Sequence, residues 1–92
     1  MPYSDKTREA IANAPDGLGK TLGQWSMTRD ISVLRLAKAT GATRQTVYNW
    51  LTGGEIANAY KTRVEELVDI LQNVRTTDDA WRAICQRFNL QF

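Results

Sequence analysis

VLRLAKATGA at residues 33–42 and TRQTVYNWLT at residues 43–52 together decide the fold of this chain. Within them Ala37 is followed by Gly41 four residues later, by Val47 six residues after that, and by Trp50 three residues further on. This spacing predicts two short helices, 33–40 and 44–51, that meet at a sharp corner. Ala37 is small enough to let the helices cross closely, and Gly41 can take the left-handed conformation that such a corner requires.

The second helix of the pair has one apolar face and one polar face. Leu36, Val47 and Trp50 are predicted to point into the shared core. Val47 and Trp50 lie one helical turn apart, so they are predicted to form a single buried ridge with Leu51 beside them. Arginine matches the O6 and N7 acceptors of guanine, and glutamine or asparagine matches the N7 and N6 pair of adenine. The pattern therefore indicates a helix-turn-helix that places its second helix in the major groove of DNA. The polar face carries Arg44, Gln45, Tyr48, Asn49 and Thr52.

Residues 33–53 resemble the helix-turn-helix of the lambda repressor and Cro family, which is common in phage and bacterial regulators. The resemblance covers about residues 18–74, and its specific part is 33–53. It implies a five-helix bundle, in which residues 18–28 form the helix before the motif and residues 59–74 form the helix after it.

The same resemblance implies that Arg44, Gln45 and Asn49 occupy the base-reading positions and that Thr43 caps their helix. Position 33, often a phosphate-binding Gln in that family, is Val33 here. The free backbone N–H groups at the start of the first motif helix can hold a phosphate, and phosphate contacts fix register without reading sequence. The candidate backbone or secondary contacts are Ser32, Arg35, Lys38, Thr43, Thr46, Tyr48, Thr52, Tyr60 and Lys61.

Capping residues and apolar periodicity predict two helices before the motif. Ser4 can cap a helix over 5–13, which a proline and a glycine then end. The next helix, over 18–28, turns its leucines and its tryptophan inward. Gly19 and Gly23 lower the predicted stability of this helix, because a glycine in a helix interior is about 1 kcal/mol less favourable than an alanine.

Two more helices are predicted after the motif. An apolar stripe marks the helix over 59–74, and the last helix, over 77–88, has a capping threonine before it and acids in its first turn. The last helix has an apolar face, formed by Trp81, Ile84, Cys85 and Phe88. Together with Leu90 and Phe92, this face either packs on 59–74 and completes the core or forms a two-fold interface between copies.

The composition of the chain excludes several classes of function. A chain of 92 residues with 42% hydrophobic side chains is expected to form one domain with a small core. The absence of histidine excludes imidazole catalysis and His-ligated metal sites, and we expect no enzyme, cofactor or metal. A single cysteine, Cys85, suits a reducing cytoplasm, and it is predicted to be a small buried residue. No run approaches the roughly 20 apolar residues of a membrane helix.

Positive charge gathers on and around the motif. The whole chain carries a net charge of +2. Residues 28–63 hold six basic side chains against two acidic ones, a local excess of +4, whereas residues 64–92 hold three basic against five acidic ones. Ordinary scatter of charge along a short chain is the alternative explanation, but the excess lies where phosphates would approach.

These observations predict an all-α, single-domain protein over residues 1–92, with five or six helices around a helix-turn-helix. The expected function is sequence-specific binding of double-stranded DNA in transcriptional regulation, with a phage or prophage repressor as the expected role. Regulators of this kind usually form homodimers, which place two recognition helices about 34 Å apart on DNA. Because helix-turn-helix folds also bind proteins, the alternative is a protein-interaction adaptor, such as a phage packaging or antitoxin-like component.

Overall fold

The computed structural model describes residues 2–91 and contains six α-helices in that range, with no strand. The predicted all-α fold is thus confirmed for the described part of the chain. None of these helices is long and apolar enough to cross a membrane. In chain order the helices are α1 (Asp5–Ala12), α2 (Leu18–Thr28), α3 (Val33–Thr40), α4 (Arg44–Leu51), α5 (Asn58–Asn73) and α6 (Thr77–Phe88).

Two of the predicted helix ranges are wrong by one residue. α1 ends one residue early because the N–H of Ala14 donates to the carbonyl of Ile11, 3.2 Å away, and tightens the chain. α5 begins and ends one residue early because Ala57 and Val74, which flank it, are both extended. The other four ranges are confirmed.

Hydroxyl side chains begin four of the six helices. Each accepts a hydrogen bond from the backbone N–H three residues further on, at 3.1–3.2 Å. A cap of this kind contributes about 1 kcal/mol, because it satisfies an N–H that the helix itself leaves free. These local signals are strong enough to fix most helix starts from sequence. The four caps are Ser4, Ser32, Thr43 and Thr76.

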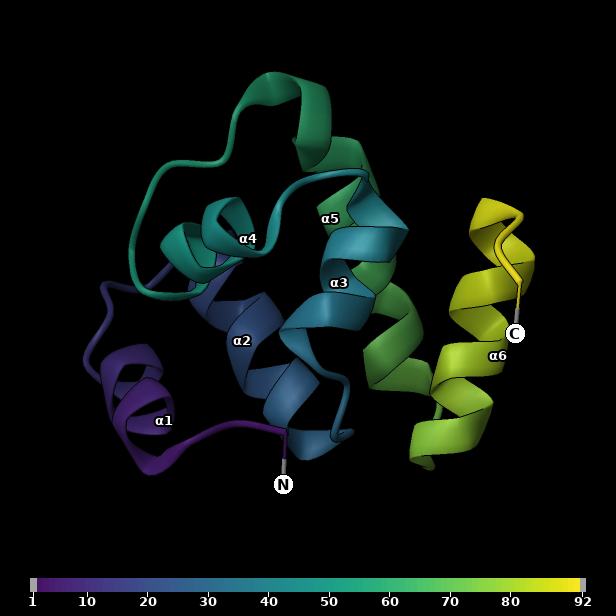
Figure 1. Cartoon of the computed structure of the whole chain (residues 1–92), viewed down its shortest axis with the longest axis horizontal. Helices are drawn as coiled ribbons and strands as arrows, with labels where there is room; N and C mark the ends of the chain where they lie inside the picture. The colour runs from purple at the N-terminus through teal and green to yellow at the C-terminus, as the bar shows by residue number, and fades with distance from the viewer. Residues whose placement is uncertain (1, 92) are drawn as a thin grey trace.

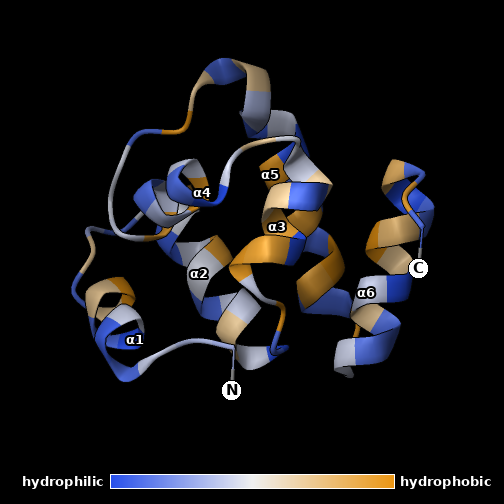
Figure 2. Ribbon diagram, viewed as in Figure 1, coloured by the Kyte–Doolittle hydropathy of each residue, from blue (hydrophilic) through white to orange (hydrophobic). Residues whose placement is uncertain are grey.

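The core lies between α2, α3 and α5, with α1 and α6 at opposite ends of the molecule (Figure 1). α2 packs on α5 and on α4, and α3 packs on α4. Figure 2 shows the hydrophobic residues gathered where α3 and α5 lie beside each other. The largest fully buried apolar side chains include Leu22, Ile31, Leu36, Val47, Leu51, Val64, Leu67 and Leu71.

The apolar face of α6 is part of this core. Trp81, Ile84 and Cys85 are buried, and Leu90 packs against the same cluster. Of the two arrangements that the sequence leaves open, packing on the rest of the chain is therefore the one found; Phe92 lies outside the described residues. Burial raises the pKa of the Cys85 thiol, which favours its protonated form.

The ends of three helices meet at Arg29, the residue that follows α2. Its Nε donates to the carbonyl of Leu71, 2.9 Å away, and to that of Val74, at the end of α5. Its own carbonyl accepts a hydrogen bond of 2.7 Å from the Thr77 hydroxyl, at the start of α6. The guanidinium also lies 5.0 Å from the centre of the Trp25 ring. One residue thus ties α2, α5 and α6 together.

We expect Tyr3→Phe to lower the free energy of unfolding by about 1–2 kcal/mol at pH 7. The Tyr3 hydroxyl is buried and donates to the carbonyl of Ile31 at 2.7 Å, so the change leaves that carbonyl without its donor. Burial also raises the pKa of the Tyr3 phenol above its usual value. The stabilisation by the Tyr3 hydroxyl is therefore complete below about pH 10, where the tyrosine of the unfolded chain ionises. It is lost as the pH rises toward the raised pKa of the folded protein.

Urea titrations of the two proteins at neutral and alkaline pH measure this difference. The gap between wild type and Tyr3→Phe should shrink above about pH 10. A gap that stays constant with pH would show that the hydroxyl is not held in its protonated form by burial.

Candidate nucleic-acid interface

α4 is anchored by its inner face. Val47, Trp50 and Leu51 are buried, and Trp50 is only 2% exposed. The centre of the Trp50 ring lies 5.2 Å from that of Tyr60, with the rings tilted by 54°. Because this face is held in the core, the opposite face of α4 must point away from it.

The turn between α3 and α4 is short and contains the left-handed glycine expected at position 41. Ala37 is buried, and α3 packs on α4. Gly41 has φ of 79° and ψ of 5°, a left-handed conformation, and its N–H donates to the Ala37 carbonyl at 2.8 Å. Only three residues separate the two helices, so the direction of α4 follows directly from that of α3.

The outer face of α4 presents the three side chains predicted to read bases. Arg44, Gln45 and Asn49 are all exposed. The Nε2 of Gln45 donates to the Oδ1 of Asn49 at 3.1 Å, so the two amides lie side by side, one turn apart. Tyr48 is 37% exposed, which is unusual for a large aromatic residue on this molecule.

The candidate hydroxyl groups are hydrogen-bonded within their own helices. Ser32 and Thr43 accept backbone N–H groups as caps of α3 and α4. Thr43 also donates to the Thr46 hydroxyl at 2.9 Å, and Thr52 donates to the Tyr48 carbonyl at 2.8 Å. These four side chains therefore stabilise the ends and turns of the two helices.

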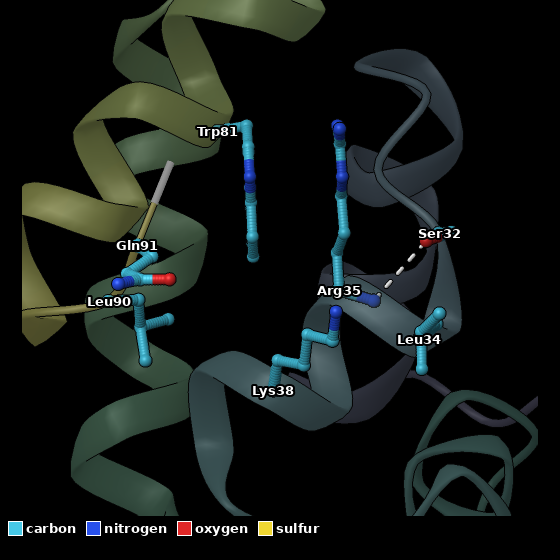
Figure 3. Close-up of a pocket in the computed structure, with 7 residues that line it drawn as sticks. All are labelled: Ser32, Leu34, Arg35, Lys38, Trp81, Leu90 and Gln91. Atoms are coloured by element: carbon cyan, nitrogen blue, oxygen red, sulfur yellow. Dashed lines mark hydrogen bonds between the residues drawn. The ribbon is translucent and has the colours of Figure 1, made fainter.

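Arg35 and Lys38 lie at a different place from the α4 face. Together with Ser32 they line a cavity between α3 and α6, which is shown in Figure 3. The Arg35 guanidinium lies 4.9 Å from the centre of the Trp81 ring, and Figure 3 shows the two side chains parallel. Sequence reasoning missed this partner, because 46 residues separate it from Arg35 and no local pattern links them.

Tyr60 and Lys61, at the start of α5, form a third group. Tyr60 is half-buried because its ring packs on Trp50. Lys61 is exposed and borders a shallow cavity that also includes Gly53 and Gly54, just after α4. Val33 is buried in the core, so its side chain takes no part in any outward-facing group.

Charge on the two motif helices is of one sign only. α3 carries Arg35 and Lys38, α4 carries Arg44, and neither helix has an aspartate or glutamate. Within residues 2–91, Arg44 and Lys38 form no salt bridge and no side-chain hydrogen bond. These two cations therefore remain available to an anionic partner such as a phosphate backbone.

Comparison with known proteins gives no independent guide to this site. No protein-family model matches the chain, and neither a curated protein nor a solved structure matches it. Within the described residues, no three His, Cys, Asp or Glu side chains gather where they could hold a metal ion. An inference about function therefore starts from the residues of α3 and α4 themselves.

Proposed function

We propose that this chain is a sequence-specific double-stranded DNA-binding regulator of transcription, and that it acts as a phage or prophage repressor of the lambda repressor and Cro type. The observation that carries the proposal is the division of α4. Its inner face is buried around Trp50, while Arg44, Gln45 and Asn49 are exposed together on its outer face. A helix held in this way offers a basic and amide-bearing surface with the chemistry of base edges.

In the proposed complex, α4 enters the major groove and reads bases with three side chains. Arg44, in the first turn, donates to O6 and N7 of a guanine. Gln45 and Asn49 each have the donor and acceptor that adenine's N6 and N7 require. Tyr48, beside them, contacts a thymine methyl group or a phosphate.

Contacts to the DNA backbone would set the register of α4 in the groove. The first turns of α3 and α4 each have backbone N–H groups that the helix itself does not bond, of which the capping hydroxyl takes one, and such groups favour phosphate. Lys38, within the motif on α3, and Lys61, after the motif on α5, are both exposed cations. Because phosphate contacts are the same for every sequence, these side chains contribute affinity and salt dependence but no base preference.

A homodimer is part of the proposal. A single small module contacts few base pairs, whereas two copies related by a two-fold axis place their α4 helices about 34 Å apart, in successive turns of one DNA face. The recognised sequence would then consist of two half-sites in inverted orientation.

The test is selection of bound duplexes from a random-sequence DNA pool, followed by sequencing. The expected result is an enriched motif with two-fold symmetry, whose half-site spacing gives the geometry of the dimer. An absence of enrichment, with only weak binding that salt abolishes, would overturn the proposal and favour the protein-interaction adaptor.

We expect Arg44→Ala to weaken binding to the selected site by about 1–3 kcal/mol and to relax the preference at one base pair. The reason is that a bidentate arginine distinguishes guanine from the other bases. Lys61→Ala is the matched comparison, because it removes one exposed positive charge without touching α4. It should weaken all sequences alike and reduce the slope of log affinity against log salt by about one.

Both variants can be compared by titrating fluorescent duplexes that differ at single base pairs, at several salt concentrations. If Arg44→Ala weakened every duplex equally, Arg44 would be a backbone contact and the proposed readout would be wrong.

A further inference from the structure

A cavity of about 490 Å³ lies between α3 and the end of α6, apart from the exposed face of α4. Its walls include Arg35 and Lys38 from α3, Trp81 from α6, and Leu90 and Gln91 from the segment after α6 (Figure 3). Pockets for small molecules in proteins have volumes of about 300–1,000 Å³. This cavity is therefore large enough for a ligand with one or two rings.

The charge of the cavity favours an anion. Arg35 and Lys38 are three residues apart on α3, so their side chains project from the same face of the helix. No carboxylate is among the side chains that line the cavity. Within residues 2–91 neither cation has a salt bridge, and the guanidinium of Arg35 lies 4.9 Å from the centre of the Trp81 ring. An arginine and a lysine so placed can together hold one carboxylate group.

The remaining walls favour a flat apolar body attached to that anion. Leu34, which is 47% exposed, and Leu90 supply apolar surface beside the two cations, together with the small exposed part of Trp81. Figure 3 shows the Leu90 side chain facing the open space between α6 and Lys38. Arg35 stacks on Trp81, which fixes the orientation of its planar group. Among the described residues, its guanidinium donates no hydrogen bond to another side chain or to the backbone.

The segment after α6 is held in place, so the cavity exists before any ligand arrives. Asn89 takes a left-handed conformation that turns the chain back at the end of α6. The N–H of Leu90 then donates to the Cys85 carbonyl at 2.8 Å, and the Cys85 thiol donates to the Gln91 carbonyl at 3.4 Å. A preformed pocket loses little conformational entropy when it binds.

We propose that this cavity binds a small carboxylate with a planar apolar body. The carboxylate lies between Arg35 and Lys38, and the body lies against Leu90 and the edge of Trp81. If the proposed DNA-binding function holds, such a ligand would cover Arg35 and Lys38, which are also candidate contacts to the DNA backbone. The site itself does not depend on that function, so its test contains no DNA.

The test is a titration of the ¹⁵N-labelled protein with 2-naphthoate, followed by amide NMR, with the uncharged 2-naphthamide in parallel. We expect 2-naphthoate to saturate with Kd below about 1 mM and to shift amides in residues 32–38 and 81–91. We expect 2-naphthamide to bind at least about tenfold more weakly, because a charge-assisted hydrogen bond is lost. Equal binding of the two compounds, or shifts confined to other parts of the chain, would overturn the proposal.

A matched pair of variants tests the position of the anion. Lys38→Gln should weaken 2-naphthoate by about tenfold, and its side chain is exposed, so the fold does not need it. Lys6→Gln removes one exposed lysine from α1, at the opposite end of the molecule (Figure 1), and should leave the affinity unchanged. If Lys38→Gln bound 2-naphthoate as tightly as Lys6→Gln, the proposed site would be wrong.

Discussion

Trp50→Ala is expected to lower the free energy of unfolding by about 3–5 kcal/mol. Trp50 is nearly fully buried, and its ring packs on Tyr60 at the junction of α4 and α5. Removal of the indole leaves a cavity that the surrounding helices cannot close completely, because they are fixed by their own connections. A domain of this size has a total stability of about 5–15 kcal/mol, so the variant should lose a large share of that stability.

Urea denaturation followed by far-ultraviolet circular dichroism measures the effect. Tyr48→Ala is the matched control, because Tyr48 lies two residues away on the outer face of α4 and is 37% exposed. That change should alter the stability by no more than about 0.5 kcal/mol. Equal midpoints for the two variants would mean that Trp50 does not hold α4 in the core.

Gly19→Ala is expected to destabilise the protein by about 3 kcal/mol, at the upper end of the range for overpacked cores. A Cβ at this position would lie 2.1 Å from the carbonyl oxygen of Trp50 and 2.9 Å from its carbonyl carbon. Both are backbone atoms, so α2 and α4 would have to separate. The clash should outweigh the roughly 1 kcal/mol that alanine adds to helix propensity.

Thermal unfolding should show this as a melting temperature lowered by more than about 10 °C. Gly17→Ser serves as the control, since a Cβ at Gly17 meets no atom within 4 Å and serine is a favoured residue at the start of a helix. A Gly19→Ala protein as stable as wild type would show that α2 and α4 do not approach this closely in solution.

The helices could be predicted from sequence because their signals are local. Ser32 and Thr43 cap the helices that they precede, and Gly41 supplies the left-handed turn between them. The two faces of α4 follow from the period of the helix, so the exposure of Gln45 and Asn49 could also be anticipated. The one-residue errors in α1 and α5 occur where no side-chain cap marks the boundary in question.

Long-range approaches could not be predicted in the same way. Gly19 looked like a weakness of α2, because the sequence does not show that the backbone of α4 will lie against it. Arg35 looked like a free cation for phosphate, because nothing near it in the chain points to its stacking on Trp81. The cavity beside Arg35 and Trp81 depends on how α6 packs against α3, which is a property of the whole fold.

The tie at Arg29 makes the C-terminal helix inseparable from the rest. A chain cut between α5 and α6 would remove Thr77, whose hydroxyl is bonded to the Arg29 carbonyl, and would uncover the core where Trp81 lies. The smallest part of the chain that can fold alone is therefore expected to include α6, which lies outside the helix-turn-helix and outside the residues 18–74 that resemble the family. If residues 18–74 alone were moved into another protein, the helix-turn-helix would lack the contacts that α6 makes with the core.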